Sequence, residues 1–184
     1  MKNITWIFGT VILMFISACE GPVGPPGPPG FDGVDGQDGI NLLGQVVEIE
    51  GTFEASNDYA LFFEFPQTIE VFESDVVLVY ILWAQTEDAD GLPVDIWRLL
   101  PQTRLLDQGI LQYNYDHTFF DVSIFLESDF DLATLQPGDT DNQIFRIAVL
   151  PADFVQGSRV NLSNIEVVMG MLNVKESDIQ RVSL

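Results

Sequence analysis

Residues 76–84 read Val-Val-Leu-Val-Tyr-Ile-Leu-Trp-Ala, the longest uninterrupted apolar run after residue 42. A strand with one face in solvent alternates apolar and polar side chains, whereas a strand buried on both faces is continuously apolar. A run of this length also suits a strand better than a helix, since buried helices commonly need ten residues or more. We therefore predict that residues 76–84 form a central strand of a sheet covered on both faces.

Segments around this run have the two-residue period of half-buried strands. In residues 45–53 one face carries Val47, Ile49 and Phe53, and the other carries Glu48, Glu50 and Thr52. In residues 143–150 one face carries Phe145, Ile147 and Val149, and the other carries Ile144, Arg146 and Ala148. In residues 119–127 one face carries Phe120, Val122, Ile124 and Leu126. Further strands are predicted over residues 59–65, 69–73, 94–100 and 110–115.

About eight short strands with no helical period between them predict an all-β fold, an antiparallel β-sandwich. One short helix is expected near the C-terminus, because Ser163 and Glu166 have the spacing of a capping box; we expect it to continue to about Leu172. Residues 177–182 are predicted to form a turn or an edge segment.

Composition limits the partners and the chemistry. The 184-residue chain has 28 Asp and Glu against 7 Lys and Arg, a formal net charge of −21. Nucleic acids and anionic membrane surfaces attract basic surfaces, so the charge argues against a nucleic-acid partner. With one Cys and one His, the chain cannot build an internal disulfide framework, a Cys-based zinc site or a multi-histidine metal site. The length suits one domain of ordinary size.

The first residues have the pattern of an export signal. Lys2 precedes an apolar run from Ile4 to Ile16, and the small residues Ser17 and Ala18 follow it. A basic start, an apolar stretch and a small-residue exit are typical of a secretory signal, and the run is shorter than the roughly 20 residues of a membrane-spanning helix. We expect residues 1–18 to be a cleaved signal peptide, with an uncleaved N-terminal anchor as the alternative.

Residues 21–41 repeat Gly-X-Y seven times without a break. The repeated glycines are Gly21, Gly24, Gly27, Gly30, Gly33, Gly36 and Gly39, and five of the ten prolines lie among them. This is the signature of collagen, since only Gly fits at the axis of three polyproline-II chains. The two Gly-Pro-Pro units favour a homotrimer, whereas Asp32, Asp35 and Asp38 would bring like charges together. The alternative is a single polyproline-II stalk, a spacer of at most about 65 Å.

The order of these segments resembles that of collagen-like surface lipoproteins of Bacteroidota. The sequence Ile16-Ser17-Ala18-Cys19 is similar to the lipobox, and the resemblance implies that Cys19 is acylated and becomes the mature N-terminus. It further implies a lipidated Cys and stalk over residues 19–41, and it gives no enzyme activity. The change of composition after Leu42 predicts a globular domain over residues 42–184. We expect a lipid-anchored protein at the outer membrane or the cell surface; whether its domain faces the periplasm or the exterior is open.

Two acidic turns are the best candidates for metal binding. Asp88 and Asp90 lie in one predicted turn, and Asp139 and Asp141 lie in another. Calcium prefers six to eight oxygen ligands, which such turns supply. The first turn is not an EF-hand loop, because Thr86 and Trp97 occupy positions where that loop needs Asp and Glu. The alternative is that both turns are simply solvated and keep the protein soluble.

Aromatic side chains are the best candidates for ligand binding. Phe119 and Phe125 lie opposite the apolar face of their predicted strand and share a face with polar residues, so we expect them to be exposed. A wider platform for carbohydrate or peptide would include Trp83, Trp97, Tyr113 and Tyr115. The alternative for each of these aromatics is packing in the core or across strands.

His117 is the only imidazole and the only candidate for a histidine base. Its neighbour Asp116 would point to the opposite face of a strand, so a catalytic pair is not expected; we predict that Asp116 and His117 form a hairpin tip. The leading hypothesis is a non-catalytic structural or adhesive surface protein. A carbohydrate- or peptide-binding module, which calcium could assist, is the alternative, and a hydrolase is the least favoured class.

Overall fold

The computed structural model describes residues 45–155 and 160–184. The predicted signal peptide, Cys19 and the Gly-X-Y segment lie outside the described residues. By its contacts the chain divides into residues 1–39 and residues 40–184, and every element below belongs to the second unit. Among the described residues, no helix has the length and apolar character needed to cross a membrane.

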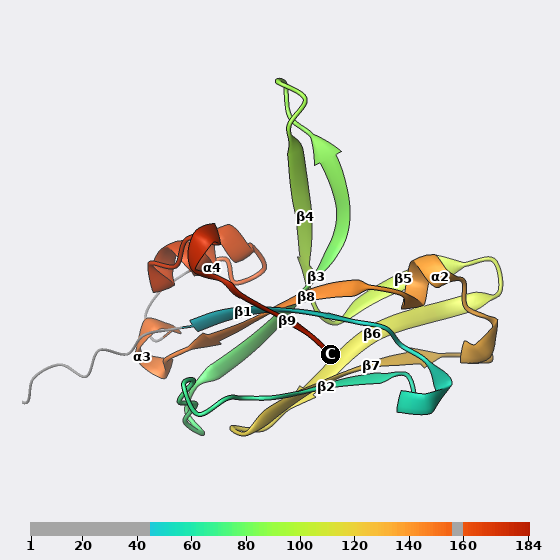
Figure 1. The fold of residues 1–184 in the computed structure, drawn as a ribbon, viewed down its shortest axis with the longest axis horizontal. Helices are drawn as coiled ribbons and strands as arrows, with labels where there is room; N and C mark the ends of the chain where they lie inside the picture. Colours follow the sequence, from blue (N-terminus) through green and yellow to red (C-terminus); the bar gives the residue numbers. More distant parts are fainter. Residues whose placement is uncertain (1–44, 156–159) are drawn as a thin grey trace, which may run out of the picture. The chain divides into compact units, whose positions relative to one another are not determined.

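Nine strands form two sheets within the described residues, which confirms the predicted all-β sandwich (Figure 1). The five-stranded sheet has the order β4 (Pro93–Leu99), β3 (Val76–Glu87), β8 (Gln143–Leu150), β1 (Gln45–Gly51) and β9 (Gln180–Ser183). The four-stranded sheet has the order β2 (Ala60–Glu64), β7 (Asp121–Ser128), β6 (Gly109–His117) and β5 (Gln102–Leu106). Neighbouring strands are antiparallel except β1 and β9, which pair in parallel.

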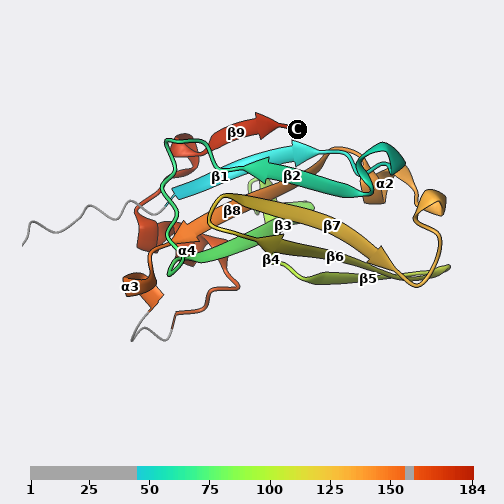
Figure 2. The ribbon, with the colours of Figure 1, turned by 90° about the horizontal axis from the view of Figure 1, so that it is seen from below.

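The main core lies between the two sheets, which Figure 2 shows as two layers. The five-stranded sheet contributes Val47, Ile49, Val77, Val79, Ile81, Phe145, Ile147 and Val149. The four-stranded sheet contributes Leu61, Phe63, Leu111, Tyr113, Val122, Ile124 and Leu126. These are the alternate positions that the two-residue period predicts, because successive side chains of a strand point to opposite faces.

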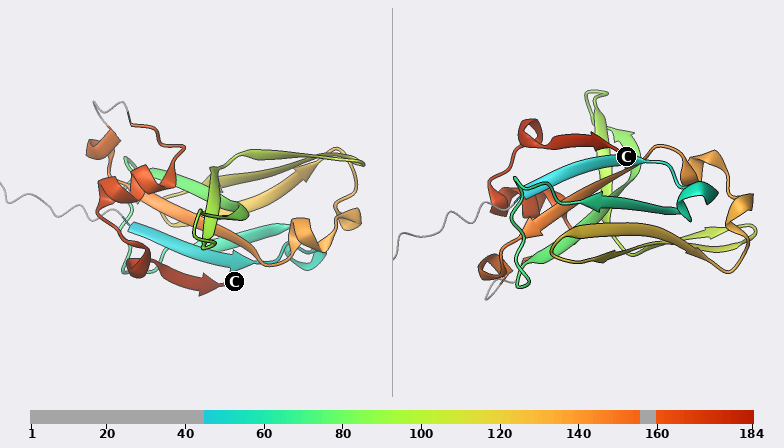
Figure 3. Two further views of the ribbon diagram at one scale, coloured as in Figure 1. Left: turned by 90° about the horizontal axis from the view of Figure 1, so that it is seen from above. Right: turned by 60° about the horizontal axis from the view of Figure 1, so that its bottom comes forward.

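A second core lies on the other face of the five-stranded sheet, beneath α4 (Ile165–Leu172). Val46, Leu78, Tyr80, Ala148 and Leu150 pack there against Ile165, Val168, Met169 and Leu172 of the helix. Strand β3 therefore has buried side chains on both faces, as the continuous apolar run predicts. Figure 3 shows α4 on this side of the sheet.

The C-terminal helix is confirmed, but its N-cap is Asn164 rather than Ser163. The Asn164 Oδ1 accepts hydrogen bonds from the backbone N–H groups of Glu166 (2.9 Å) and Val167 (3.3 Å). The remaining helical segments are short: η1 (Ala55–Asn57), η2 (Leu132–Thr134), α2 (Pro137–Thr140), α3 (Ala152–Val155) and η3 (Glu176–Asp178). Residues 177–182 thus contain both a turn and the edge strand β9.

Several details of the predicted strands need correction. Residues 69–73 form a loop bounded by turns rather than a strand, although Ile69 and Val71 still pack on the core. Strand β5 was not expected, because its inward side chains include Gln102 and Arg104. The hairpin tip falls at residues 118–120, so His117 lies within β6, where it pairs with Val122. Phe120 precedes β7 and is exposed instead of sharing the buried face.

Candidate functional site

Strands β3 and β4 extend beyond the sheet as a two-stranded ribbon, residues 82–97, which we call the arm. Strand β8 pairs with β3 only as far as Ile81, whereas β4 pairs with β3 as far as Glu87. The arm therefore has no third strand, and Figure 1 shows it standing out from the sandwich. At its tip the Asp88 Oδ1 accepts hydrogen bonds from the backbone N–H groups of Asp90 and Leu92, each at 2.9 Å.

A β-bulge marks the base of the arm. Leu82 pairs with Trp97 and Ala84 pairs with Ile96, so Trp83 is the extra residue on β3. An extra residue bends the strand and increases its twist, which turns the ribbon away from the plane of the sheet. The bulge thus accounts for the direction of the arm.

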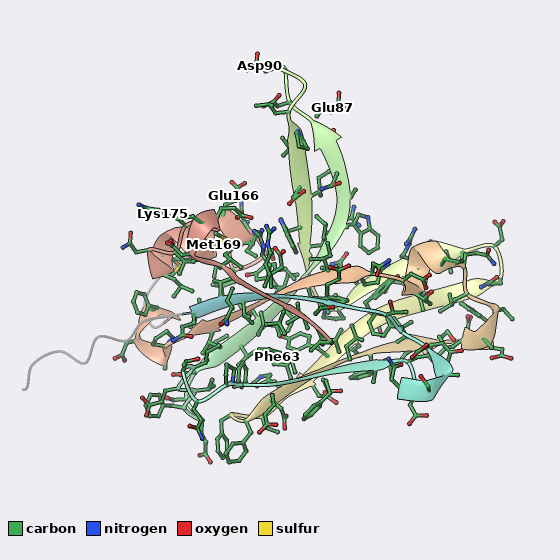
Figure 4. All side chains as sticks on the ribbon, in the orientation of Figure 1. Phe63, Glu87, Asp90, Glu166, Met169 and Lys175 are labelled. Atoms are coloured by element: carbon green, nitrogen blue, oxygen red, sulfur yellow. The ribbon has the colours of Figure 1, made fainter. Side chains whose placement is uncertain are left out.

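An open groove of about 640 Å³ lies between the arm and the helical segments α4 and η3. We call it the arm groove. The arm contributes Gln85, Pro93, Val94, Asp95 and Trp97. The helical side contributes Ile165, Glu166, Met169, Gly170, Val174, Lys175 and Glu176, and Arg146 of β8 lies at the base. Figure 4 shows Glu166, Met169 and Lys175 on the helical side, and Asp90 at the far tip of the arm.

Arg146 is the buried centre of this region. Its Nε lies 3.0 Å from Glu48 Oε2, its Nη2 pairs with Glu176, and its Nη1 lies 3.8 Å from the sulfur of Met169. Its guanidinium also lies 4.1 Å from the centre of the Trp97 ring. A buried guanidinium needs partners for its fixed set of donors, and here they come from β1, β4, α4 and η3. One side chain therefore joins the helical side of the arm groove to the sheet.

The exposed charges at the rim of the arm groove are mainly acidic. Asp95 accepts a hydrogen bond from Gln85 at 2.8 Å and has no cationic partner among the described residues. Glu166 likewise forms no ion pair within the described part of the chain. The backbone N–H of Lys175, which donates to Asp178, lowers the pKa of that carboxyl, and the Lys175 charge adds to this effect. The contact is made by the Lys175 backbone, and the Lys175 ammonium group forms no ion pair among the described residues.

On the opposite side of the arm, Trp83 lies against two other arginines. The guanidinium of Arg98 lies 4.3 Å and that of Arg104 lies 5.5 Å from its ring centre. Arg104 also pairs with the buried Asp139 at 2.6 Å, and a pocket of about 190 Å³ lies beside Trp83 and Arg104. The Tyr113 hydroxyl donates to the Asp139 carbonyl at 2.7 Å, and burial raises the pKa of Tyr113 to about 12.

The described residues do not assemble the predicted calcium site. No group of three or more Asp, Glu, His or Cys side chains within residues 45–155 and 160–184 is placed to share a metal ion. The Asp88 side chain accepts backbone hydrogen bonds within the turn of the arm, and the Asp139 side chain forms an ion pair with Arg104. Asp141 accepts a hydrogen bond from the Thr140 hydroxyl at 2.8 Å. Asp90 lies at the exposed tip.

Phe119 and Phe125 lie in different settings. Phe119 is exposed in the β6–β7 turn, where its ring centre lies 3.9 Å from that of Phe120. Phe125 is half-buried within β7, between Ala60 and Asn114 on the neighbouring strands. Nothing in the described structure joins the two rings into one platform.

The remaining candidates from the sequence have partners close by. His117 stacks on Tyr115, with ring centres 6.2 Å apart. Tyr115 donates to the carbonyl of Val77 at 3.1 Å, and burial raises its pKa. Trp83 and Trp97 lie at the base of the arm on guanidinium groups instead of forming one aromatic surface.

Sequence reasoning placed Arg146 on the correct face of its strand but missed its role, and it missed Met169 and Glu176. A signal was present: Arg146 stands alone in Ile144–Leu150, in which every other residue is apolar. An isolated charge in a strand covered on both faces requires a buried partner.

Three comparisons with known proteins complete the description of the chain. No family model, no curated protein and no solved structure matches it.

Proposed function

We propose that this chain is a lipid-anchored, non-catalytic protein of the bacterial cell envelope that displays its β-sandwich for adhesion to a partner. The arm groove is the adhesive surface in this proposal. The observation that carries it is the arm itself, a two-stranded ribbon that leaves the sheet and forms one wall of the 640 Å³ groove.

The composition of the arm groove suits binding. Apolar side chains line it from both sides, and its volume lies within the roughly 300–1,000 Å³ that is usual for ligand sites. Val94, on the arm, is 40% exposed although it is apolar. An exposed apolar surface rimmed by polar groups is typical of an interaction site.

The charges at the base of the groove form a network of ion pairs. Arg146 is already paired with Glu48 and Glu176, and Glu48 also pairs with Arg181 at 2.9 Å. These ion pairs connect the sheet to the helical side and support the shape of the groove.

The anchor and the stalk rest on the sequence. Cys19 follows the lipobox-like Ile16-Ser17-Ala18, and the Gly-X-Y segment separates it from the first described strand. Two or more acyl chains give stable attachment to a membrane, which a single chain does not. A spacer of up to about 65 Å would then hold the sandwich away from that membrane.

Fractionation of cells that produce the full chain tests the anchor. The unmodified protein should sediment with membranes, and Cys19→Ser should release it. A Cys19→Ser protein that stays in the membrane fraction would contradict lipid attachment at this residue.

A screen against glycans and extracellular matrix proteins tests the adhesive role, with the full chain purified in non-ionic detergent. We expect at least one retained ligand, whose binding is weakened in Val94→Asn and kept in the control Phe62→Ser. Phe62 is 58% exposed on the other sheet, so the control removes an exposed apolar side chain away from the groove. Equal loss in both variants, or no retained ligand, would contradict the proposal.

A further inference from the structure

We infer that the arm groove binds a short cationic, amphipathic segment of a partner protein, one in which apolar side chains alternate with Lys or Arg. This inference rests on the proposed adhesive function and names the chemistry of the partner. The groove has an apolar lining, and the charges that remain after its internal ion pairs have formed are mainly acidic.

The apolar lining comes from both walls. Met169 and Ile165 of α4 are largely buried, and the half-buried Trp97 lies across from them on the arm. Trp is among the residues that most often dominate binding energy at interfaces. Met adapts its shape to different apolar partners because its side chain is flexible and polarizable. An apolar side chain of the partner therefore has a place between the arm and the helix.

The charges left at the rim are mainly negative. Arg146 is paired with Glu48 and Glu176, whereas Lys175 is an exposed cation that forms no ion pair in the described residues. Asp95 on the arm and Glu166 on α4 remain as exposed carboxylates without an ion pair in the described residues. Because Asp95 lines the groove from the arm and Glu166 lines it from α4, a cationic side chain in the groove can be approached by a carboxylate from each wall.

Net charge disfavours the other occupants. Residues 42–184 contain 24 Asp and Glu and 6 Lys and Arg, so 24 − 6 leaves a net charge of −18. A second copy of the domain would bring the same negative charge to the groove. Residues 19–41 contain four acidic residues (Glu20, Asp32, Asp35 and Asp38) and no basic one, so this part of the chain is also a poor occupant. A cationic partner is favoured because complementary potentials accelerate association and suppress wrong partners.

Peptide binding to the full chain in non-ionic detergent tests the inference. Three dye-labelled hexapeptide amides serve as probes: Leu-Lys, Leu-Ser and Leu-Glu, each repeated three times. Fluorescence anisotropy measures their affinities for the unmodified chain and for three variants. Asp95→Asn with Glu166→Gln removes the two rim charges, and Asp95→Asn keeps an acceptor for Gln85. Glu64→Gln with Asp116→Asn removes two exposed charges from the other sheet, and Val94→Ser shortens the apolar wall. Matching thermal melts show that each variant is folded.

We expect the Lys peptide to bind tightest and to lose about tenfold in affinity with the rim variant, from two partly screened charge pairs. The loss with Val94→Ser should be smaller, and the Glu64 and Asp116 variant should bind like the unmodified chain. If the rim variant and the Glu64 and Asp116 variant weakened Lys-peptide binding equally, binding would depend only on the overall negative charge of the domain. That result would overturn the inference. Absence of Lys-peptide binding would also overturn it. Equal binding of the Ser peptide would refute the charge requirement and leave the adhesive role standing.

Discussion

The guanidinium of Arg146 lies 4.1 Å from the centre of the Trp97 ring, and this contact joins the base of the arm to the middle strand of the five-stranded sheet. Arg146 also pairs with Glu48 on β1 and with Glu176 on η3. The arm and the helical segments that form the two walls of the arm groove thus share one buried cation. Its removal should affect both walls together.

A double-mutant cycle tests the buried pair of Arg146 and Glu48. Arg146→Met should lower the free energy of unfolding by about 3 kcal/mol, because it leaves Glu176 without a partner and the buried Glu48 with only the exposed Arg181. The double variant Glu48→Gln with Arg146→Met should lose less than the sum of the single losses, since no buried charge is then left unpaired. Urea denaturation of the four proteins measures this. Additive losses would show that the two groups do not interact.

Replacement of Tyr80 by Phe tests the link between β3 and the loop before α4. The Tyr80 hydroxyl donates to the carbonyl of Leu162 at 2.5 Å. Its loss should lower the free energy of unfolding by about 1 kcal/mol while the ring stays packed. Tyr59→Phe is the matched control, because the Tyr59 hydroxyl makes no hydrogen bond in the described structure, and it should change stability little. Similar denaturation midpoints for Tyr80→Phe and the unmodified chain would refute the contribution of this bond.

Alkaline pH should destabilise the sandwich through its buried tyrosines. Burial raises the pKa of Tyr113 to about 12 and raises the pKa values of Tyr80 and Tyr115. An unfolded tyrosine titrates near pH 10, so the unfolded chain releases these protons first. The stabilisation is complete below about pH 10 and is lost as the pH rises from about 10 towards 12.

Thermal melts and phenolate absorbance over this range check the alkaline effect. The melting temperature should fall above about pH 10, and Tyr113→Phe should make the fall less steep. An unchanged melting temperature, with all phenolate absorbance appearing near the ordinary tyrosine pKa, would contradict the burial effect.

Gly109 begins β6 with φ +147°, a backbone conformation that favours glycine. A Cβ atom at this position would collide with Asp129 Oδ1 and would lie 2.8 Å from a ring carbon of Phe130. Gly109→Ala should therefore lower the free energy of unfolding by about 2 kcal/mol. In the control Gly138→Ala the added Cβ would meet no atom within 4 Å, so the change should stay within about 0.5 kcal/mol. Chemical denaturation compares the two, and equal stabilities would show that the site tolerates a side chain.

Local pattern predicted the fold best where burial follows the period of the strand. The run at residues 76–84 predicted a strand covered on both faces, and Leu78 and Tyr80 do pack beneath α4 while Val77 and Val79 face the sandwich core. In β7 the buried Val122, Ile124 and Leu126 follow the predicted alternation, although Phe120 falls outside the strand.

The alternation of apolar and polar residues gave wrong predictions for two segments, β5 and residues 69–73, whose structure depends on their position in the fold. Strand β5 is an edge strand with Arg104 turned inward to Asp139 and Leu105 turned out to solvent, the reverse of the usual arrangement. Residues 69–73 alternate like a strand but pair with no neighbouring strand in the described fold, and Ile69 is buried within a turn. Alternation reports which side chains are buried, and backbone pairing depends on a free strand edge.

The candidate site shows the same division. Aromatic residues were expected to form a ligand surface, and the structure instead places Trp83 and Trp97 on guanidinium groups at the base of the arm. The arm groove is built from residues 85–97, residue 146 and residues 165–176, which are far apart in sequence. No local pattern reports how such segments meet.

The sequence by itself determined the strand character of the domain, its acidic charge, and the lipobox-like and Gly-X-Y motifs that predict an anchor and a stalk. Each of these is a property of neighbouring residues, read from periodicity or spacing. Only the tertiary structure decided that β3 and β4 leave the sheet as an arm, and that Arg146 joins four elements beneath the groove. Those features depend on contacts between residues up to 98 positions apart. A buried charge such as Arg146 is stable only where other segments of the fold supply its partners, and the local sequence does not specify those segments.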